Sequence, residues 1–293
     1  METLKQCPIC ENEHNKVFLR CTDYTVSRET FTIVSCDQCG FKFTNPRPEA
    51  GSLGKYYLSE DYVSHSNASK GIVNFLYQKV RVYTLKKKLN LINRLSAKGR
   101  LLDIGCGTGE FLQTCRTGGW DVIGIEPSEQ ARKQAIGSFG LDIKTEEELN
   151  NLNKESFNVI SLWHVLEHVP ALNERIEEIK QLLKPEGKII IAVPNCSSED
   201  AAHYGEYWAA YDVPRHLYHF SPKDIGRLAE KHGLRVIETL PMLFDSYYVS
   251  MLSEKYKTGH RGLFRALIRG VISNRKAAKN NLTYSSQIYI LGK

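Results

Sequence analysis

The stretch from Leu101 to Leu112 constrains the fold more than any other part of this sequence. An apolar run carries an acid, Asp103, and three glycines follow at alternate positions: Gly105, Gly107 and Gly109. Glycine permits a positive φ and lets backbone N–H groups come close to a ligand, where a side chain would obstruct them. The pattern predicts a strand, a tight turn and a helix, which is the opening of a nucleotide-binding βα unit.

The spacing of these glycines differs from that of a dinucleotide-binding turn. The dinucleotide pattern G-x-G-x-x-G would place its third glycine at the position of Glu110, whereas this chain has it at Gly109. Downstream, residues 121–126 predict a second strand that closes on Glu126. Folds of this type place a carboxylate there to bind ribose hydroxyls. The positions of Asp103 and Glu126 relative to the glycines argue against an unrelated Gly-rich turn.

Asp103, the three glycines and Glu126 together resemble the class I S-adenosylmethionine (SAM)-dependent methyltransferases. The resemblance implies an α/β fold with a Rossmann-like, seven-stranded core over residues 96–293, and SAM as the cofactor. In that family an acid after the third strand often meets the adenine, and Glu146 is the candidate here. The alternative is that Glu146 belongs to the solvated start of a helix. The implied cofactor-binding residues are Asp103, Gly105, Cys106, Gly107, Gly109, Glu126, Pro127, Glu146, Trp163 and His164.

The compartment and the cysteine chemistry follow from what the sequence does not contain. No run reaches the apolar length of a transmembrane helix, and the first residues carry no apolar stretch of signal-peptide type. We therefore expect a cytoplasmic protein with reduced thiols, so its eight cysteines are not interpreted as four disulfides. Cys106, Cys115 and Cys196 are expected to be small buried apolar residues.

Two C-x-x-C units, Cys7–Cys10 and Cys36–Cys39, stand in the first 46 residues. Each presents two thiolates on a tight turn, and two such knuckles can close a tetrahedral structural zinc site. The alternation of apolar and polar residues between them suits short strands. We predict a zinc ribbon over residues 1–46 that holds Zn²⁺ through these four cysteines; a redox pair is the alternative.

Residues 47–95 are expected to be a linker and a helical segment. Pro46 and Pro48 force an extended chain, and apolar residues recur at helical spacing from 71 to 95. Tyr56, Tyr57 and Tyr62 lie between, either packed on a neighbouring domain or lining the mouth of the substrate site. A zinc ribbon, then Pro-x-Pro, then Tyr-Tyr resembles the N-terminal part of bacterial methyltransferases that act on sugars and related biosynthetic intermediates.

His164, Glu167 and His168 follow the predicted fourth strand, residues 157–163. Ligands of open α/β sheets bind beyond the carboxyl ends of strands, so these side chains are placed where chemistry is expected. Leu-Glu-His-Val resembles the same stretch in small-molecule methyltransferases. Quinone-biosynthesis relatives hold a divalent cation there with E-x-x-E-H, but His164 replaces the first Glu, which argues against a metal. Glu167 can instead be a buried carboxylate that accepts backbone N–H groups.

Residues 207–222 concentrate histidines, an arginine, an acid and aromatics, which are costly to bury without a purpose. The pattern W-x-x-x-D-x-P-R-H-x-x-x-F-S resembles an acceptor-side loop of the same methyltransferase group. We expect Tyr211, Arg215 and His219 to contact the acceptor, with Arg215 binding an acidic group. His216 and His168 are the candidate general bases, since imidazole titrates near neutral pH. The alternative is a loop anchored by its own aromatics.

The net charge of +6 is concentrated in a predicted insertion, residues 241–283. Residues 255–280 hold eight basic side chains and no acid, so the rest of the chain is slightly acidic. Within the insertion an apolar stripe over 263–272 and arginines at intervals of four predict a basic amphipathic helix. A lid, a dimer face or a peripheral membrane contact through 261–272 are the possible roles, and core packing of a lid is favoured.

These patterns predict a SAM-dependent methyltransferase that acts on a small-molecule or sugar-type acceptor in a biosynthetic pathway. A nucleotide- or lipid-linked sugar belongs to the same acceptor class. One alternative is an RNA methyltransferase, which the lack of a basic and aromatic surface on the ribbon argues against. The other is a non-catalytic SAM-binding or zinc-scaffold protein. The sequence sets neither the acceptor atom nor the oligomeric state.

Overall fold

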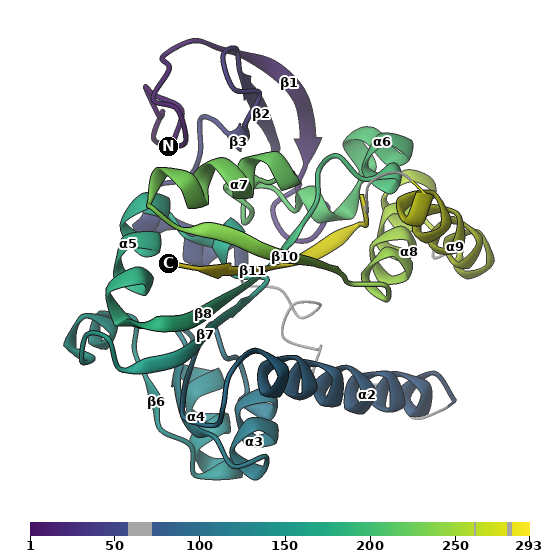
Figure 1. Cartoon of the computed structure of the whole chain (residues 1–293). Coiled ribbons are helices and arrows are strands. Elements are labelled where there is room, and N and C mark those ends of the chain that lie inside the picture. The colour runs from purple at the N-terminus through teal and green to yellow at the C-terminus, as the bar shows by residue number, and fades with distance from the viewer. Residues whose placement is uncertain (58–71, 261, 280–282) are drawn as a thin grey trace. The chain divides into compact units, whose positions relative to one another are not determined.

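The computed structural model describes residues 1–57, 72–260, 262–279 and 283–293 of the chain (Figure 1). The chain forms two compact units. Unit 1 comprises Met1–His65, Leu166–Leu172 and Ala192–Tyr289, and unit 2 comprises Ser66–Val165, Asn173–Ile191 and Ile290–Lys293. The N-terminal cysteine-bearing segment thus groups with residues from the C-terminal part of the chain. The boundaries expected from the sequence, at residues 46 and 96, stay predictions about family domains.

Unit 2 alternates strands and helices. The first residue of α5 and the last three residues of β8 belong to unit 1. Its described elements are α2 (Ile72–Leu95), β4 (Arg100–Ile104), α3 (Glu110–Thr117), β5 (Asp121–Ile125), α4 (Glu129–Phe139), β6 (Ile143–Lys144), the 3₁₀ turn η3 (Glu147–Asn151), β7 (Phe157–Trp163), α5 (Leu172–Leu182) and β8 (Leu183–Pro194). Ser128 caps α4, since its side chain accepts the backbone N–H of Ala131.

The main sheet has seven strands in the order β10-β11-β8-β7-β4-β5-β6, where β10 is Arg235–Pro241 and β11 is Ser286–Gly292. Strand β4 pairs in parallel with both β5 and β7. Leu101, Leu102, Val159 and Ile160 of these strands have no exposed surface, because parallel strands are covered on both faces. The predicted Rossmann-like, seven-stranded α/β fold is confirmed, and β11 lies between β10 and β8.

Unit 1 contains a second, antiparallel sheet whose order is β1-β2-β3-β9. The first three strands are β1 (Asn15–Thr22), β2 (Thr30–Cys36) and β3 (Lys42–Thr44), and the fourth is β9 (Tyr218–His219). The register pairs Phe43 with Tyr218. Part of the 207–222 segment is therefore an edge strand of the N-terminal sheet, so this segment is not only a loop.

The remaining helices of unit 1 are α6 (Glu199–Tyr204), α7 (Pro222–Lys231), α8 (Asp245–Thr258) and α9 (Leu263–Lys279). The described part of unit 1 also contains the short 3₁₀ turns η1 (Ala50–Tyr57), η4 (Leu166–His168), η5 (Gly205–Tyr207) and η6 (Ala209–Tyr211). The first turn of α7 is closed by a capping box between Ser221 and Asp224. Among the described helices, none has both the length and the apolar character needed to cross a membrane.

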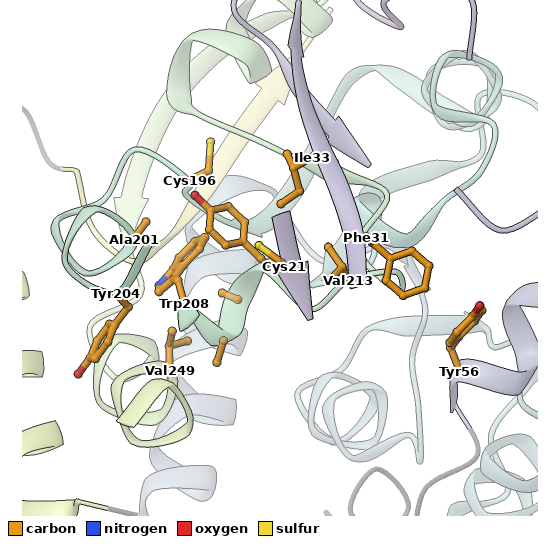
Figure 2. Close-up of a cluster of buried hydrophobic side chains, with 13 residues drawn as sticks. Cys21, Phe31, Ile33, Tyr56, Cys196, Ala201, Tyr204, Trp208, Val213 and Val249 are labelled. Carbon is orange, nitrogen blue, oxygen red and sulfur yellow. The ribbon is translucent and has the colours of Figure 1, made fainter. Parts of the chain in front are cut away.

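The core of unit 1 joins the N-terminal strands to the 207–222 segment (Figure 2). Cys21 and Ile33 pack in the same cluster as Trp208 and Val213. The indole N–H of Trp208 donates to Asp200 Oδ2 at 3.0 Å, which satisfies the polar atom inside this core. The aromatics of the segment thus hold it in place, as the anchored-loop interpretation expected.

Helix α9 packs differently from the expectation. The favoured prediction was that its apolar stripe packs in a core. That prediction is wrong for the N-terminal half of the helix, where four large apolar residues are exposed: Leu263, Phe264, Leu267 and Ile268. Its buried residues are small ones: Ala266, Gly270, Ser273 and Ala277. Small residues let α9 approach α8 closely, since even a Cβ at Gly270 would lie 2.4 Å from the ring of Tyr247. Arg261 of the expected 261–272 surface, like Tyr62, lies outside the described residues.

Candidate active site

The glycine-rich turn of unit 2 leads from β4 into α3. Gly105, Gly107 and Gly109 all have positive φ, at 71°, 56° and 83°. A Cβ at Gly105 would lie 2.4 Å from a methyl of Val165, whereas a Cβ at Gly107 would meet nothing within 4 Å. The turn is therefore closed on the side of Gly105 and open at Gly107, so its backbone there is accessible to a ligand.

Glu126 closes β5 as the sequence predicted, and its carboxylate organises the turn. Gly107 N–H donates to Oε2 and Ser128 N–H donates to Oε1, both at 2.8 Å. Each carboxylate oxygen has a further lone pair, so a ribose diol can still be accepted in a bidentate manner. The neighbouring Pro127 directs its carbonyl to Arg132, which donates to it at 2.7 Å.

Asp103 lies inside β4, opposite Ser161 of β7. The Ser161 hydroxyl donates to Asp103 Oδ1 at 2.5 Å. Burial raises the pKa of Asp103 to about 7, while the hydrogen bond of Ser161 opposes that rise. The sequence did not identify Ser161; its only signal was the position opposite Asp103 on a neighbouring parallel strand. Burial likewise raises the pKa of the adjacent Cys106 thiol, which is consistent with the expected buried apolar role.

Trp163 and His164 stand at the carboxyl end of β7. Lys88 Nζ lies 3.9 Å from the centroid of the Trp163 ring, a cation–π contact that the sequence analysis missed. The indole Nε1 of Trp163 is buried and has no hydrogen-bond partner among the described residues. His164 has a φ of 57°, which is strained for a residue with a Cβ and is typical of functional sites. Both residues suit a ligand-facing strand end.

Glu146 follows β6, as expected, and forms an ion pair with Arg175 of α5. Arg175 also lies 3.3 Å from Glu178. The carboxylate of Glu146 is 44% exposed, so it retains room for a further contact. Its contact with the adenine stays a prediction.

The four cysteines of the N-terminal knuckles converge in unit 1. Their sulfur atoms all lie within 4.8 Å of one another, and the pairs Cys7–Cys39 and Cys10–Cys36 are 3.6 Å and 3.5 Å apart. Tetrahedral zinc with Zn–S bonds of about 2.3 Å separates its sulfurs by about 3.8 Å. The donor set and its spacing fit a structural zinc ion.

The two knuckles share one backbone geometry. Glu11 N–H donates to Cys7 O and Gly40 N–H donates to Cys36 O, each at 2.9 Å. Both Glu11 and Gly40 have positive φ, at 63° and 79°. Each knuckle is therefore a closed turn that directs its two thiols to one side.

His216 is the central side chain of a second cluster in unit 1. Its Nδ1 lies 2.8 Å from Ala210 O, and since a carbonyl only accepts, this nitrogen carries the proton. The other ring nitrogen, Nε2, lies 4.0 Å from a carboxylate oxygen of both Glu167 and Asp212. In the neutral ring, Nε2 thus has the lone pair and can accept a proton.

His168 packs edge-on against His216, with ring centroids 4.6 Å apart. Its Nδ1 lies 3.1 Å from Arg215 O and 3.0 Å from the Tyr57 hydroxyl. Burial, and next the nearby His216, lower the pKa of His168 to about 4. A lower pKa makes an imidazole a weaker proton acceptor, so His168 is the less suitable base of the two.

Glu167, His168 and His216 form a possible cation-binding set. One ligand atom from each lies within 4.8 Å of the others. Each imidazole also directs Nδ1 to a backbone carbonyl, the arrangement that orients metal-ligating histidines. His164, the residue compared with the first Glu of the quinone-enzyme pattern, is not a member of this set.

The three residues expected to contact the acceptor are buried within unit 1. Tyr211 is 3%, Arg215 1% and His219 4% exposed. The Thr44 hydroxyl donates its proton to His216 O, and His219 Nε2 lies 3.1 Å from Thr44 Oγ1. Because the hydroxyl proton is already used, His219 Nε2–H is the donor in this second hydrogen bond. Burial holds the pKa of His219 well below its usual range. The contacts of these three residues with an acceptor stay predictions. Within the protein, each of the three side chains already packs against another residue.

A family model described as a methyltransferase domain matches residues 77–239, more than half of the chain. This chain belongs to the methyltransferase family. The ubiquinone biosynthesis O-methyltransferase of Neisseria meningitidis serogroup C is 30% identical over 173 residues, covering 54% of this methyltransferase and 70% of that enzyme. The enzyme of that name from Nitrosococcus oceani is 31% identical over 182 residues, covering 57% and 75%.

A solved structure, that of Haemonchus contortus phosphoethanolamine N-methyltransferase 2 with S-adenosyl-L-methionine, has a TM-score of 0.50 at 17% identity. The match covers 71% of this chain and 52% of that protein. At this identity the likeness concerns the fold alone. The family membership makes this chain a SAM-dependent methyltransferase, and the open turn at Gly107 beside Glu126 fits that cofactor.

A Glu126 variant tests the cofactor site. Glu126→Ala should weaken SAM binding by roughly ten- to a hundredfold, because charge-assisted hydrogen bonds contribute about 1.5–3 kcal/mol. Isothermal calorimetry with SAM measures it. Glu129→Ala, an exposed acid in α4, is the matched control and should bind normally. Unchanged affinity in a folded Glu126→Ala protein would remove this carboxylate from the site.

Proposed function

We propose that this methyltransferase transfers the SAM methyl group to a hydroxyl oxygen of a small molecule, including sugar-type acceptors. The observation that carries the proposal is the His216 imidazole, whose Nδ1–H is held by Ala210 O so that Nε2 can accept a proton. A neutral hydroxyl is a poor nucleophile and must lose its proton on transfer. The O-methyltransferase names of the relatives support the same acceptor atom.

When bound, SAM would supply an electrophilic sulfonium methyl group to an acceptor oxygen in line with the carbon–sulfur bond, and S-adenosylhomocysteine would be the leaving group. Because the sulfur loses its positive charge in the step, positioning is the main task of the protein. We assign SAM binding to the glycine turn, Glu126 and the end of β7. His216 Nε2 takes the hydroxyl proton, and the carboxylates of Glu167 and Asp212, 4.0 Å away, stabilise the resulting imidazolium.

Labelled SAM identifies the acceptor class. The protein would be incubated separately with a panel of catechols and other phenols, a panel of sugar nucleotides, and total RNA. We expect the labelled methyl group to appear in a product of one of the first two panels. The label should resist mild base, because the product is an ether. Salt-sensitive incorporation into RNA would overturn the proposal in favour of the RNA alternative, which the relatives reported above do not support.

We also infer a structural role for zinc at the cysteine cluster. With four protein sulfurs the ion would have no open position for water, so it would stabilise the fold and not activate a reactant. Its place at the end of the β1-β2-β3-β9 sheet, where Cys36 ends β2, makes it a support for the sheet that contains Tyr218 and His219.

The purified protein should contain one zinc ion per chain. Elemental analysis by inductively coupled plasma mass spectrometry is the measurement. The double variant Cys7→Ser, Cys36→Ser should lose the ion, because thiolate ligands are removed from both knuckles, while Cys115→Ser, a buried cysteine of α3, should keep it. Full metal content in the double variant would refute the site.

A further inference from the structure

Helix α9 of unit 1 carries its large apolar residues on the outside. Leu263, Phe264, Leu267 and Ile268 are 58%, 76%, 56% and 45% exposed. An ordinary surface helix buries such residues and exposes polar ones. Here the inward face is made by small residues, so the outward apolar side chains, which we call the α9 patch, are not a by-product of core packing.

The chain around the α9 patch is strongly basic. From Lys255 to Lys293 the sequence contains no acidic residue. Arg265 lies between members of the patch, and Arg269 and Arg275 follow on the same helix, whereas Lys276 is paired with Glu199 of α6. The last acid before this region, Glu254, is buried and accepts the Tyr204 hydroxyl at 3.1 Å, so it does little to offset the exposed positive charge.

A cavity of about 330 Å³ opens beside the α9 patch. Helices α6, α8 and α9, which lie together in Figure 1, supply its lining. The residues that carry charge are Lys257, Arg265 and Arg269 against the single acid Glu254. Ile268 belongs to both the cavity lining and the patch, so an anion in the cavity would lie next to exposed apolar side chains.

We propose that α9 and this cavity dock the methyltransferase on an anionic phospholipid surface, with the patch in the acyl boundary and a headgroup phosphate in the cavity. Aliphatic and aromatic residues beside arginines on one helix are typical of interfacial helices. A nucleic acid would use the positive charge but has no need of exposed Leu and Ile side chains. The proposal concerns where the enzyme works and does not depend on which hydroxyl it methylates.

Vesicle co-sedimentation of the zinc-loaded full chain tests the proposal. The protein should bind phosphatidylcholine vesicles containing phosphatidylglycerol at least about tenfold more tightly than pure phosphatidylcholine vesicles, with a loss at high salt. Phe264→Ser, Leu267→Ser should weaken binding about tenfold or more, and so should Arg265→Glu. The control Val82→Ser, Ile136→Ser removes two apolar residues of unit 2 that are 63% and 47% exposed, and it should bind like the parent.

A reporter variant keeps the test independent of folding losses. In Leu267→Trp, the emission of the new indole should shift to shorter wavelength on addition of anionic vesicles, and soluble glycerol phosphate should not produce that shift. Absence of vesicle binding by the parent, or equal binding by the α9 patch variant, would overturn the proposal. So would a parent dimer that the α9 patch variant abolishes without any vesicle binding, since the surface would then contact a second copy.

Discussion

His216→Ala should lower the methyl-transfer rate by about 10²–10⁴ while SAM binds with parental affinity. The substitution removes Nε2, the nitrogen that we propose takes the proton from the hydroxyl group of the substrate. It leaves the glycine turn and Glu126 unchanged. Its Nδ1–H bond to Ala210 O is also lost, so the fold must be checked by thermal unfolding of the zinc-loaded protein. Single-turnover kinetics with the acceptor found by labelling is the measurement, because it isolates the chemical step.

The matched variant is His168→Ala. Burial lowers the pKa of His168 to about 4, so its loss should affect the rate less than the loss of His216. The opposite order, with His216→Ala active and His168→Ala crippled, would move the base role to His168. Near-parental rates in both variants would mean that proximity alone drives the transfer, and they would refute an imidazole base.

A metal alternative has a separate signature. If Glu167, His168 and His216 hold a cation, all three single variants should lose both activity and a bound metal ion beyond the structural zinc. A general base predicts instead that His216→Ala loses activity with unchanged metal content. Elemental analysis of the same samples used for kinetics therefore separates the two chemistries.

Local patterns were sufficient to predict the core of the fold. Asp103, the three glycines and Glu126 all lie within the single β4-α3-β5 unit, and the turn between β4 and α3 depends on the positive φ of each glycine. The seven-stranded sheet itself was implied by the resemblance to the class I SAM-dependent methyltransferases, whereas periodicity predicted single elements such as the helical segment within 71–95. The cysteine knuckles were predicted for the same reason, since each is a closed local turn.

Features that depend on distant parts of the chain were not predicted. Tyr218 and His219 join the N-terminal sheet through β3, a pairing that no local pattern encodes. Ser161 acquires its role only because β7 lies beside β4. The outward apolar face of α9 could not be read from periodicity, because a stripe of apolar residues has the same spacing whether it faces a core or a membrane.

Arg215 illustrates this limit most clearly. From the sequence it was a candidate clamp for an acidic acceptor, but two of its partners, Asp23 and Tyr56, lie far from it in the chain. Its guanidinium donates to Asp212, to Asp23 Oδ1 at 2.9 Å and to Tyr56 O at 2.8 Å. The Arg215 and Asp23 side chains are 1% and 0% exposed, so this is a buried charge network. Asp23 also accepts backbone N–H groups of its own turn, including Ser27 at 2.8 Å.

Arg215→Met should reduce the free energy of unfolding by about 3–5 kcal/mol, because it leaves buried carboxylates without their cation. Burial alone would raise the pKa of Asp23, but Arg215 holds it below the usual 3.8. The stabilisation is therefore present above that value and should disappear as the pH falls below it. Urea unfolding of the zinc-loaded protein, compared with exposed Arg235→Met, is the measurement. The triple variant with Asp23→Asn and Asp212→Asn should recover much of the loss. A clamp predicts the reverse: parental stability in Arg215→Met, with a raised KM for an acidic acceptor.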